Sequence, residues 1–283
     1  MQLRCSDGYP LAATLFEPPR KEARSSLVIG SALGVPRYLY FKLARFLAAR
    51  GWAVLTFDYR GIHESREGQV AGSDMRMEHW GSRDLQAALG WMLEHRPRAA
   101  LCYLGHSCGG QILGLAPHAE RVKAVILVAS QSGYWKHWDW PYKWGVWWTW
   151  QTLGVLAPLF NYLPARLMGI SSVNLPGGVA RQWAAWGRRP RYLFDDRSGL
   201  DTSLYRRLEM PLLSVSMKDD PFFAPPRAVE ALLREYPAAL IERMEVRPGD
   251  LGLNRIGHFG FFRDKCRALW EETAAWLEAE LAR

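Results

Sequence analysis

Gly105-His106-Ser107-Cys108-Gly109 follows an apolar run, residues 99–104, and precedes the glycine- and leucine-rich segment 110–115. An apolar run before a tight turn is typical of a buried strand, and the segment after it has the pattern of an amphipathic helix. A serine at such a turn forms a nucleophile elbow, in which strained backbone dihedrals push Oγ out of the sheet edge. The small residues two before and two after it let strand and helix approach closely. The stretch predicts that Ser107 is a nucleophile.

Short apolar runs and helical patterns alternate on both sides of this elbow. The runs predict strands at residues 11–16, 26–29, 53–57, 101–104, 124–129, 211–216 and 240–246. Apolar residues at helical spacing predict helices at residues 38–50, 78–93, 226–236 and 261–281. Strands that alternate with helices imply right-handed crossovers and a mostly parallel sheet with helices on both faces. The fold class predicted is therefore α/β.

The alternation stops at about Ser130 and resumes at Pro211. Seven tryptophans lie between Trp135 and Trp150, followed by prolines and glycines. We interpret residues 132–205 as a helical, tryptophan-rich cap that is inserted into a core of residues 1–131 and 206–283. An insertion at this point in the chain would hang over the elbow.

Two further motifs follow strands and complete a catalytic order. Asp219-Asp220-Pro221-Phe222 comes after the strand at 211–216, and Gly257-His258-Phe259-Gly260 comes after the last strand. In the order Ser, acid, His, the imidazole of His258 would take the proton of Ser107 Oγ, and a carboxylate would orient the imidazole. We predict Asp220 as the acid because it directly precedes the Pro221 turn, with Asp219 as the adjacent alternative.

An oxyanion that forms at the attacked carbonyl needs two N–H donors. The N–H of Cys108, one residue after the nucleophile, is the first candidate. The second is expected in the loop after the strand at 26–29, where Ala32 is the first choice and Leu33 the next.

These motifs, together with Asp58-Tyr59-Arg60-Gly61-Ile62, resemble the α/β-hydrolase superfamily. Within it, the chain resembles predicted bacterial hydrolases related to the serine aminopeptidase and monoglyceride lipase group. The resemblance covers nearly the whole chain. It implies an α/β-hydrolase fold with a Ser-Asp-His triad, a mobile cap, and no cofactor or metal.

The substrate is inferred from the cap, because aromatic side chains gather where an apolar ligand or an interface is covered. We take Trp135, Trp147 and Trp148, with His106 beside the elbow, as candidate substrate contacts. The main hypothesis is a serine hydrolase that cleaves a carboxylic ester or thioester with an apolar part. An amidase, peptidase or acyltransferase with the same triad is the alternative within enzymes, and a non-catalytic ligand-binding protein is the alternative outside them.

Charge and composition limit the other partners and the location. The net charge is +8, but the basic residues are scattered rather than gathered in a stripe, which argues against nucleic-acid binding. Residues 145–165 carry no charge, yet Gln151 and Thr152 argue against a membrane span, so weak contact of the cap with a membrane interface is the milder prediction. The N-terminus lacks the apolar core of a signal peptide, and the four cysteines show no metal-like spacing. We expect a cytoplasmic protein with reduced thiols.

Overall fold

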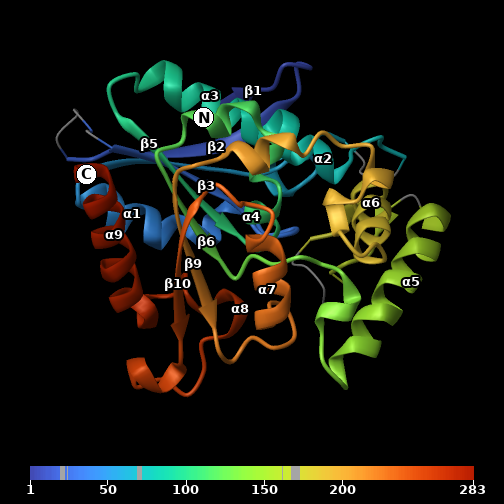
Figure 1. The fold of residues 1–283 in the computed structure, drawn as a ribbon. Helices are drawn as coiled ribbons and strands as arrows, with labels where there is room; N and C mark the ends of the chain where they lie inside the picture. The colour runs from blue at the N-terminus through green and yellow to red at the C-terminus, as the bar shows by residue number, and fades with distance from the viewer. Residues whose placement is uncertain (20–22, 24, 69–71, 161, 167–172) are drawn as a thin grey trace.

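The computed structural model describes residues 1–19, 23, 25–68, 72–160, 162–166 and 173–283. Its centre is an eight-stranded sheet in the order β1-β2-β4-β3-β5-β6-β9-β10 (Figure 1). The strands are β1 (Gln2–Arg4), β2 (Pro10–Phe16), β3 (Ser25–Gly30), β4 (Trp52–Phe57), β5 (Ala100–His106), β6 (Ala124–Val128), β9 (Pro211–Met217) and β10 (Leu240–Val246). The two pairings of β2 are antiparallel, and those from β4 to β10 are parallel.

The predicted strands are confirmed, with ends that differ by at most two residues. Their buried apolar side chains explain this agreement, because β4, β6 and most of β5 are covered on both faces. The short strand β1 was not predicted, since three residues carry too little pattern to be recognised.

Helices cover both faces of the sheet, as predicted. In Figure 1 the sheet separates α3 (Gln86–His95) from α1 (Phe41–Ala49) and α9 (Arg267–Ala282). Helices α1 and α9 lie side by side, where the rings of Phe46 and Trp270 are 5.7 Å apart. Helix α7 (Pro226–Leu233) connects β9 to β10.

Several predicted helices differ in extent from those in the structure. The helix expected at 78–93 consists of α2 (Met77–His79), a π-helical turn (Trp80–Leu85) and α3. The last helix begins at Arg267 rather than at 261, because α8 (Gly257–Gly260) and a 3₁₀ turn (Asp264–Cys266) precede it. Likewise, a 3₁₀ turn (Arg37–Tyr40) precedes α1.

The helix after the elbow, α4 (Cys108–Gln111), is only four residues long. The expected continuation to residue 115 is wrong, since a separate 3₁₀ turn (Leu113–Leu115) follows. Glycine favours a helix poorly, which explains why the segment does not continue. Tyrosine hydroxyls, rather than a further turn, donate hydrogen bonds to the last carbonyls: Tyr103 to Gly109, Tyr236 to Gly110 and Tyr205 to Gln111.

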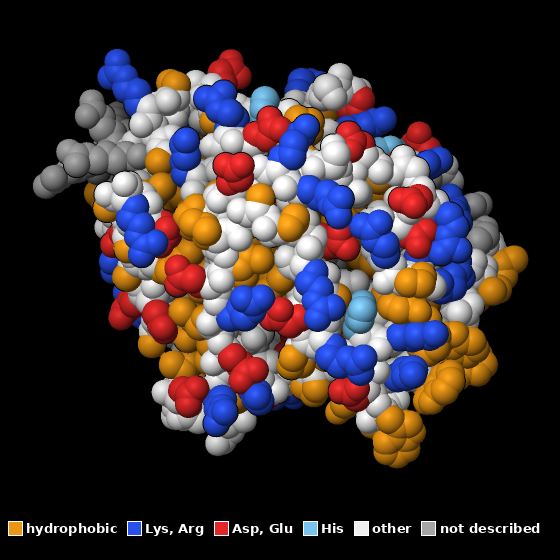
Figure 2. All heavy atoms as spheres, in the orientation of Figure 1, with side chains coloured by type: hydrophobic (Ala, Val, Ile, Leu, Met, Phe, Trp, Pro, Cys, Tyr) orange, Lys and Arg blue, Asp and Glu red, His pale blue; other side chains and the backbone are white. Residues whose placement is uncertain are grey.

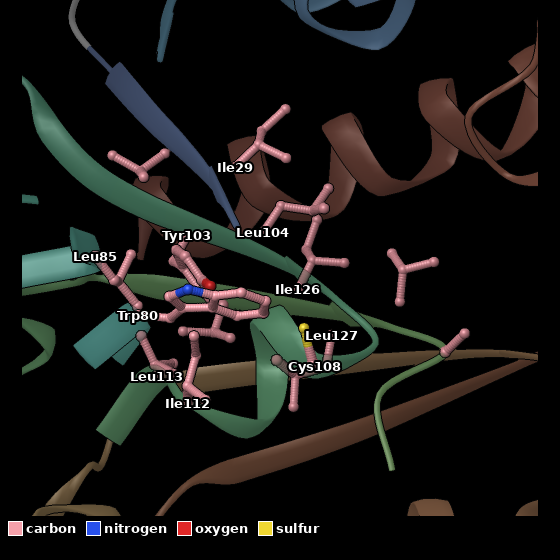
Figure 3. Close-up of a cluster of buried hydrophobic side chains, with 14 of the residues drawn as sticks. Ile29, Trp80, Leu85, Tyr103, Leu104, Cys108, Ile112, Leu113, Ile126 and Leu127 are labelled. Atoms are coloured by element: carbon pink, nitrogen blue, oxygen red, sulfur yellow. The ribbon is translucent and has the colours of Figure 1, made fainter. Parts of the chain in front are cut away.

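One part of the hydrophobic core lies on the face of the sheet that α4 covers, around the fully buried indole of Trp80 (Figure 3). This ring stacks on Tyr59 with 4.9 Å between ring centroids, and its Nε1–H donates to the Arg60 carbonyl. Leu85, Ile112, Leu113 and Leu127 lie on the same side of the sheet as this indole, whereas Ile29, Leu104 and Ile126 point to the opposite face. The core therefore supports the elbow directly from below.

The tryptophan-rich segment lies beside the sheet rather than in it (Figure 1). It holds α5 (Tyr142–Phe160), the two-stranded pair β7 (Tyr162–Leu163) and β8 (Leu175–Pro176), and α6 (Gly177–Gly187). Helix α5 packs against α6, and α6 in turn contacts α2, where Gln182 Oε1 accepts a hydrogen bond from the N–H of Glu78. In the part of the chain that the structure describes, no helix is both long and apolar enough to cross a membrane.

Candidate active site

Ser107 lies at the strained turn that the sequence predicts. Its φ of 51° and ψ of −117° fall in a region that residues other than glycine rarely adopt. Its N–H donates to the Val128 carbonyl, which anchors the turn to β6. A Cβ atom on Gly105 would lie 2.6 Å from the backbone of Gly110, so the strand and the helix approach too closely for any larger residue.

His258 and Asp220 lie together in the loops after β10 and β9. His258 Nδ1 is 2.6 Å from Asp220 Oδ2, and both side chains are almost fully buried. Because a carboxylate only accepts hydrogen bonds, this contact places a proton on Nδ1 and leaves Nε2 as the basic nitrogen. The arrangement is that of an imidazole oriented to take up a proton.

Asp219 makes a different contact from Asp220. Its carboxylate accepts hydrogen bonds from the N–H groups of Ile256 and Gly257, at 2.9 and 3.0 Å for Oδ2. These two residues directly precede His258, so Asp219 holds the loop while Asp220 contacts the ring. The geometry favours Asp220 for the acid.

The structure brings the serine and the histidine into one region without a direct hydrogen bond. Among the described residues, Ser107 Oγ has no hydrogen bond to His258. The backbone carbonyl of His258 is nevertheless 3.0 Å from Nε2 of His106, the neighbour of Ser107. Catalytic hydrogen bonds are often long in ligand-free enzymes and shorten when substrate binds.

The two expected oxyanion donors differ in their surroundings. The N–H of Cys108 is the first of α4 and has no acceptor within the described chain, as at other helix N-termini. The Ala32 N–H instead donates to the hydroxyl of Tyr40 at 2.8 Å, so the first choice for the second donor is corrected. The N–H of Leu33, the next choice, has no such partner in the described segments.

The Cys108 side chain points away from the elbow, toward the Ser31 carbonyl at 3.5 Å. Burial raises the pKa of its thiol well above the ordinary range, so the thiolate is not formed at neutral pH. All four cysteines are buried and unpaired. Within the described ranges, no three His, Cys, Asp or Glu side chains gather as metal ligands would.

The prediction that His106 contacts substrate is wrong. Its side chain is fully buried, and both ring nitrogens contact protein atoms, Nδ1 the Tyr40 hydroxyl and Nε2 the His258 carbonyl. Burial lowers the pKa of His106 well below its ordinary value, with a smaller contribution from His258. It is therefore a neutral residue behind the site.

A cavity of about 460 Å³ lies on the far side of Phe223 from the catalytic candidate His258. Half of its lining residues are aromatic, from α5, α6, the segment before α5 and the segment after Asp220: Trp138, Trp148, Trp150, Trp183, Phe222 and Phe223, with Gln131, Thr149 and Thr152 as polar members. The ring of Phe223 lies 4.8 Å from that of His258. On the other side, Gln111 of the elbow helix donates to the carbonyl of Gln131 at 2.7 Å. Phe223 and Gln131 thus link the cavity to His258 and to the elbow helix, while neither Ser107 nor His258 is itself among the described lining residues.

Of the three tryptophans predicted to contact substrate, the described lining includes only Trp148. Trp135 and Trp147 lie outside it, in a row of rings that runs through Trp144 to Trp148. The sequence analysis missed Phe222 and Phe223, although their position directly after Asp220 and Pro221 was a usable signal. It also missed Trp183, for which the sequence offers no local signal.

Comparisons with known proteins agree with this architecture. A sequence model of the alpha/beta hydrolase fold matches residues 32–246. No curated protein sequence matches the chain. Among solved structures, a soluble variant of monoglyceride lipase from Saccharomyces cerevisiae, in complex with a substrate analogue, is similar at a TM-score of 0.74 and 16% identity, over 98% of this chain and 95% of that one.

Two esterases show the same likeness in fold. Est1E from Butyrivibrio proteoclasticus with bound ferulic acid has a TM-score of 0.67 at 16% identity, over 100% of both chains. An esterase from Thermogutta terrifontis has a TM-score of 0.62 at 17% identity, over 99% of this chain and 98% of that one. The sheet order, the strained serine after β5 and the match over residues 32–246 lead to one conclusion: this chain belongs to the alpha/beta hydrolase fold family.

Proposed function

We propose that this protein is a serine hydrolase that cleaves a carboxylic ester or thioester with an apolar part through an acyl-enzyme. The observation that carries the proposal is the pair of His258 and Asp220, 2.6 Å apart, in loops that also approach the strained Ser107 turn. Such a pair beside a serine elbow is what nucleophilic acyl transfer requires.

In the proposed reaction, Ser107 Oγ attacks the carbonyl carbon while its proton passes to Nε2 of His258. The C–O or C–S bond then breaks, and the same proton moves to the departing alcohol or thiol. Water repeats the sequence on the acyl-enzyme and releases the acid. The Asp220 carboxylate orients the ring and stabilises the imidazolium, while the N–H groups of Cys108 and Leu33 would stabilise the oxyanion.

The aromatic cavity supports an apolar acyl or alcohol part for the substrate. Its volume of about 460 Å³ lies within the range of small-molecule sites, roughly 300–1,000 Å³. Trp148 and Trp150 of α5 form part of its wall, which supports the division into a core and a cap at residues 132–205. The similar solved structures include a monoglyceride lipase and esterases, in keeping with an ester substrate.

The same site could serve an amidase, a peptidase or an acyltransferase, because each forms an acyl-enzyme. The mostly apolar lining, without a charged side chain among its described members, favours the ester hypothesis over a peptidase of charged substrates. A non-catalytic ligand-binding protein would not need the His258–Asp220 contact, which argues against that alternative.

A lipid surface is the second partner that we propose. Trp140, Trp144 and Trp148 are exposed by 80%, 51% and 63%, and Figure 2 shows hydrophobic side chains gathered over α5. Lys136 and Lys143 lie 5.3 and 5.4 Å from the ring of Trp135. Exposed indoles beside lysines suit a headgroup region. The cytoplasmic location stays a prediction from the sequence.

The test is covalent labelling of the purified protein with a fluorophosphonate, followed by a series of p-nitrophenyl esters of rising chain length. We expect wild-type protein to be labelled and to hydrolyse the esters, and the Ser107→Ala variant to lose both while it keeps its circular dichroism spectrum. Labelling of the folded variant at the wild-type rate would assign the nucleophile elsewhere. A wild-type protein that neither reacts nor hydrolyses would favour the binding-protein alternative.

A further inference from the structure

Three hydrogen bonds run in series behind the proposed triad. The Ala32 N–H donates to Tyr40 Oη at 2.8 Å, Tyr40 Oη lies 2.9 Å from His106 Nδ1, and His106 Nε2 lies 3.0 Å from the carbonyl oxygen of His258. Both side chains in the middle of this series are fully buried. We call this series the Tyr40–His106 relay.

The direction of each bond in the relay is determined by its partners. The His258 carbonyl can only accept, so Nε2 of His106 carries the proton. Burial keeps the pKa of His106 well below its ordinary value, so the ring is neutral and Nδ1 is an acceptor. Burial also raises the pKa of Tyr40, whose hydroxyl therefore stays protonated and donates to Nδ1. Every donor and acceptor in the series is then satisfied in a single arrangement.

The relay connects three loops that are far apart in the sequence. Ala32 precedes Leu33, the proposed second oxyanion donor; His106 precedes Ser107; and the carbonyl at the other end belongs to His258 itself. Tyr40 also packs edge-on against Phe262 at 4.7 Å, and His106 packs on the same ring at 4.6 Å. This packing limits the rotation of both side chains.

We propose that Tyr40 and His106 are positioning residues. They fix the relative positions of the loop with Ala32 and Leu33, the elbow, and the loop that carries His258. The proposal rests on the proposed function. Neither residue touches substrate, since neither is exposed. Their effect would pass through the placement of the Leu33 N–H and the His258 ring, where small displacements lower the rate of the chemical step rather than binding.

The first experiment replaces Tyr40 by phenylalanine, which removes only the hydroxyl. We expect kcat for p-nitrophenyl butyrate to fall by about 10- to 100-fold with KM changed less than twofold, and the rate of fluorophosphonate labelling to fall in parallel. Tyr59→Phe is the matched control, because the Tyr59 hydroxyl is also buried but has no hydrogen-bond partner among the described residues. Its kcat should equal that of the wild type.

Two variants of His106 separate the halves of the relay. Glutamine can keep the donor toward the His258 carbonyl, and asparagine can keep the acceptor for Tyr40. We expect each to lower kcat, and the double variant Tyr40→Phe/His106→Gln to be no slower than the slower single variant, because both changes break one series. Active-site titration with the fluorophosphonate corrects each rate for protein that has not folded.

The outcomes distinguish this proposal from the proposed function. If the wild type is active and Tyr40→Phe loses thermal stability but keeps the wild-type kcat, the relay is only structural and the proposal is wrong. Multiplicative losses in the double variant would also overturn it, because independent effects show no common series. If the wild type itself reacts with neither probe nor ester, it is the proposed function that fails.

Discussion

Large side chains around the elbow are buried and hydrogen-bonded, whereas several of those on helix α5 are exposed to solvent. Around Ser107, tyrosine hydroxyls and histidine nitrogens are buried and hydrogen-bonded, as in the contacts of Tyr205 with Gln111 and of Tyr40 with His106. On α5, Trp144 and Trp148 expose half or more of their surface. Buried polar contacts permit a single arrangement, because breaking one leaves an unsatisfied group. Exposed indoles impose no such requirement and remain available to a ligand or an interface.

The tryptophans of α5 also differ from one another in burial. Trp150 is buried, its Nε1–H donates to the Gly133 carbonyl, and its ring lies 4.5 Å from that of Trp183. Trp148, two residues earlier, is exposed by 63% and lines the cavity. One helix therefore carries tryptophans that hold it in place and others that face outward. The predictions below test this division, beginning with the largest effect.

Asp220→Asn should lower kcat by about 10⁴-fold, as loss of the orienting carboxylate does in other serine enzymes. Asp219→Asn should be milder, since the amide oxygen can still accept one of the two backbone hydrogen bonds that hold the loop before His258. Steady-state kinetics on a single ester measures both. The reverse ranking would move the acid to Asp219.

Gly105→Ala and Gly145→Ala compare the two regions directly. The new methyl at position 105 would lie 2.6 Å from the Gly110 backbone, so we expect a loss of about 1–3 kcal/mol in the free energy of unfolding. At position 145, within α5, nothing lies within 4 Å, and alanine should stabilise the helix by up to about 1 kcal/mol. Urea unfolding measures both changes. Equal effects would contradict the contrast between a tight elbow and an open helix.

The buried His106 should make the protein less stable in acid. Its folded-state pKa lies well below 6.5, so below pH 6.5 the unfolded chain binds a proton that the folded chain does not. The stabilisation is thus present above pH 6.5 and is lost as the pH falls, by up to about 1.4 kcal/mol per pH unit. The free energy of unfolding, measured with denaturant between pH 5 and 7, should depend less steeply on pH for His106→Gln than for the wild type. Parallel slopes would mean that His106 titrates alike in both states.

Trp148→Ala should change the free energy of unfolding by less than about 0.5 kcal/mol, as is usual for exposed positions, yet alter the preference between short and long acyl esters. Trp140→Ala is the control: it is exposed by 80% and lies outside the cavity lining, so the chain-length profile should stay unchanged. In the presence of anionic liposomes, both variants should bind less than the wild type. A Trp148 variant that unfolds without any change in profile would make the indole a packing residue.

Local pattern alone predicted the sheet, the elbow and the three triad candidates. Strands β3 to β6 are buried along almost their whole length and mostly apolar because both faces are covered, and this leaves a nearly continuous signal in the sequence. The serine turn carries its signal in Gly105 and Gly109, which close packing requires. His258 and Asp220 were recognisable because each lies in the connection after a strand, where α/β folds place their sites.

Only the tertiary structure decided the contacts between distant segments. The hydroxyl of Tyr40 accepts a hydrogen bond from the Ala32 N–H, and His106 is turned inward toward the His258 carbonyl, 152 residues away in the sequence. Which tryptophans line the cavity depends on the orientation in which α5 packs against α6. The periodicity of a sequence shows only which face of a segment is apolar. Which residues of another segment contact that face is determined by packing of the whole chain.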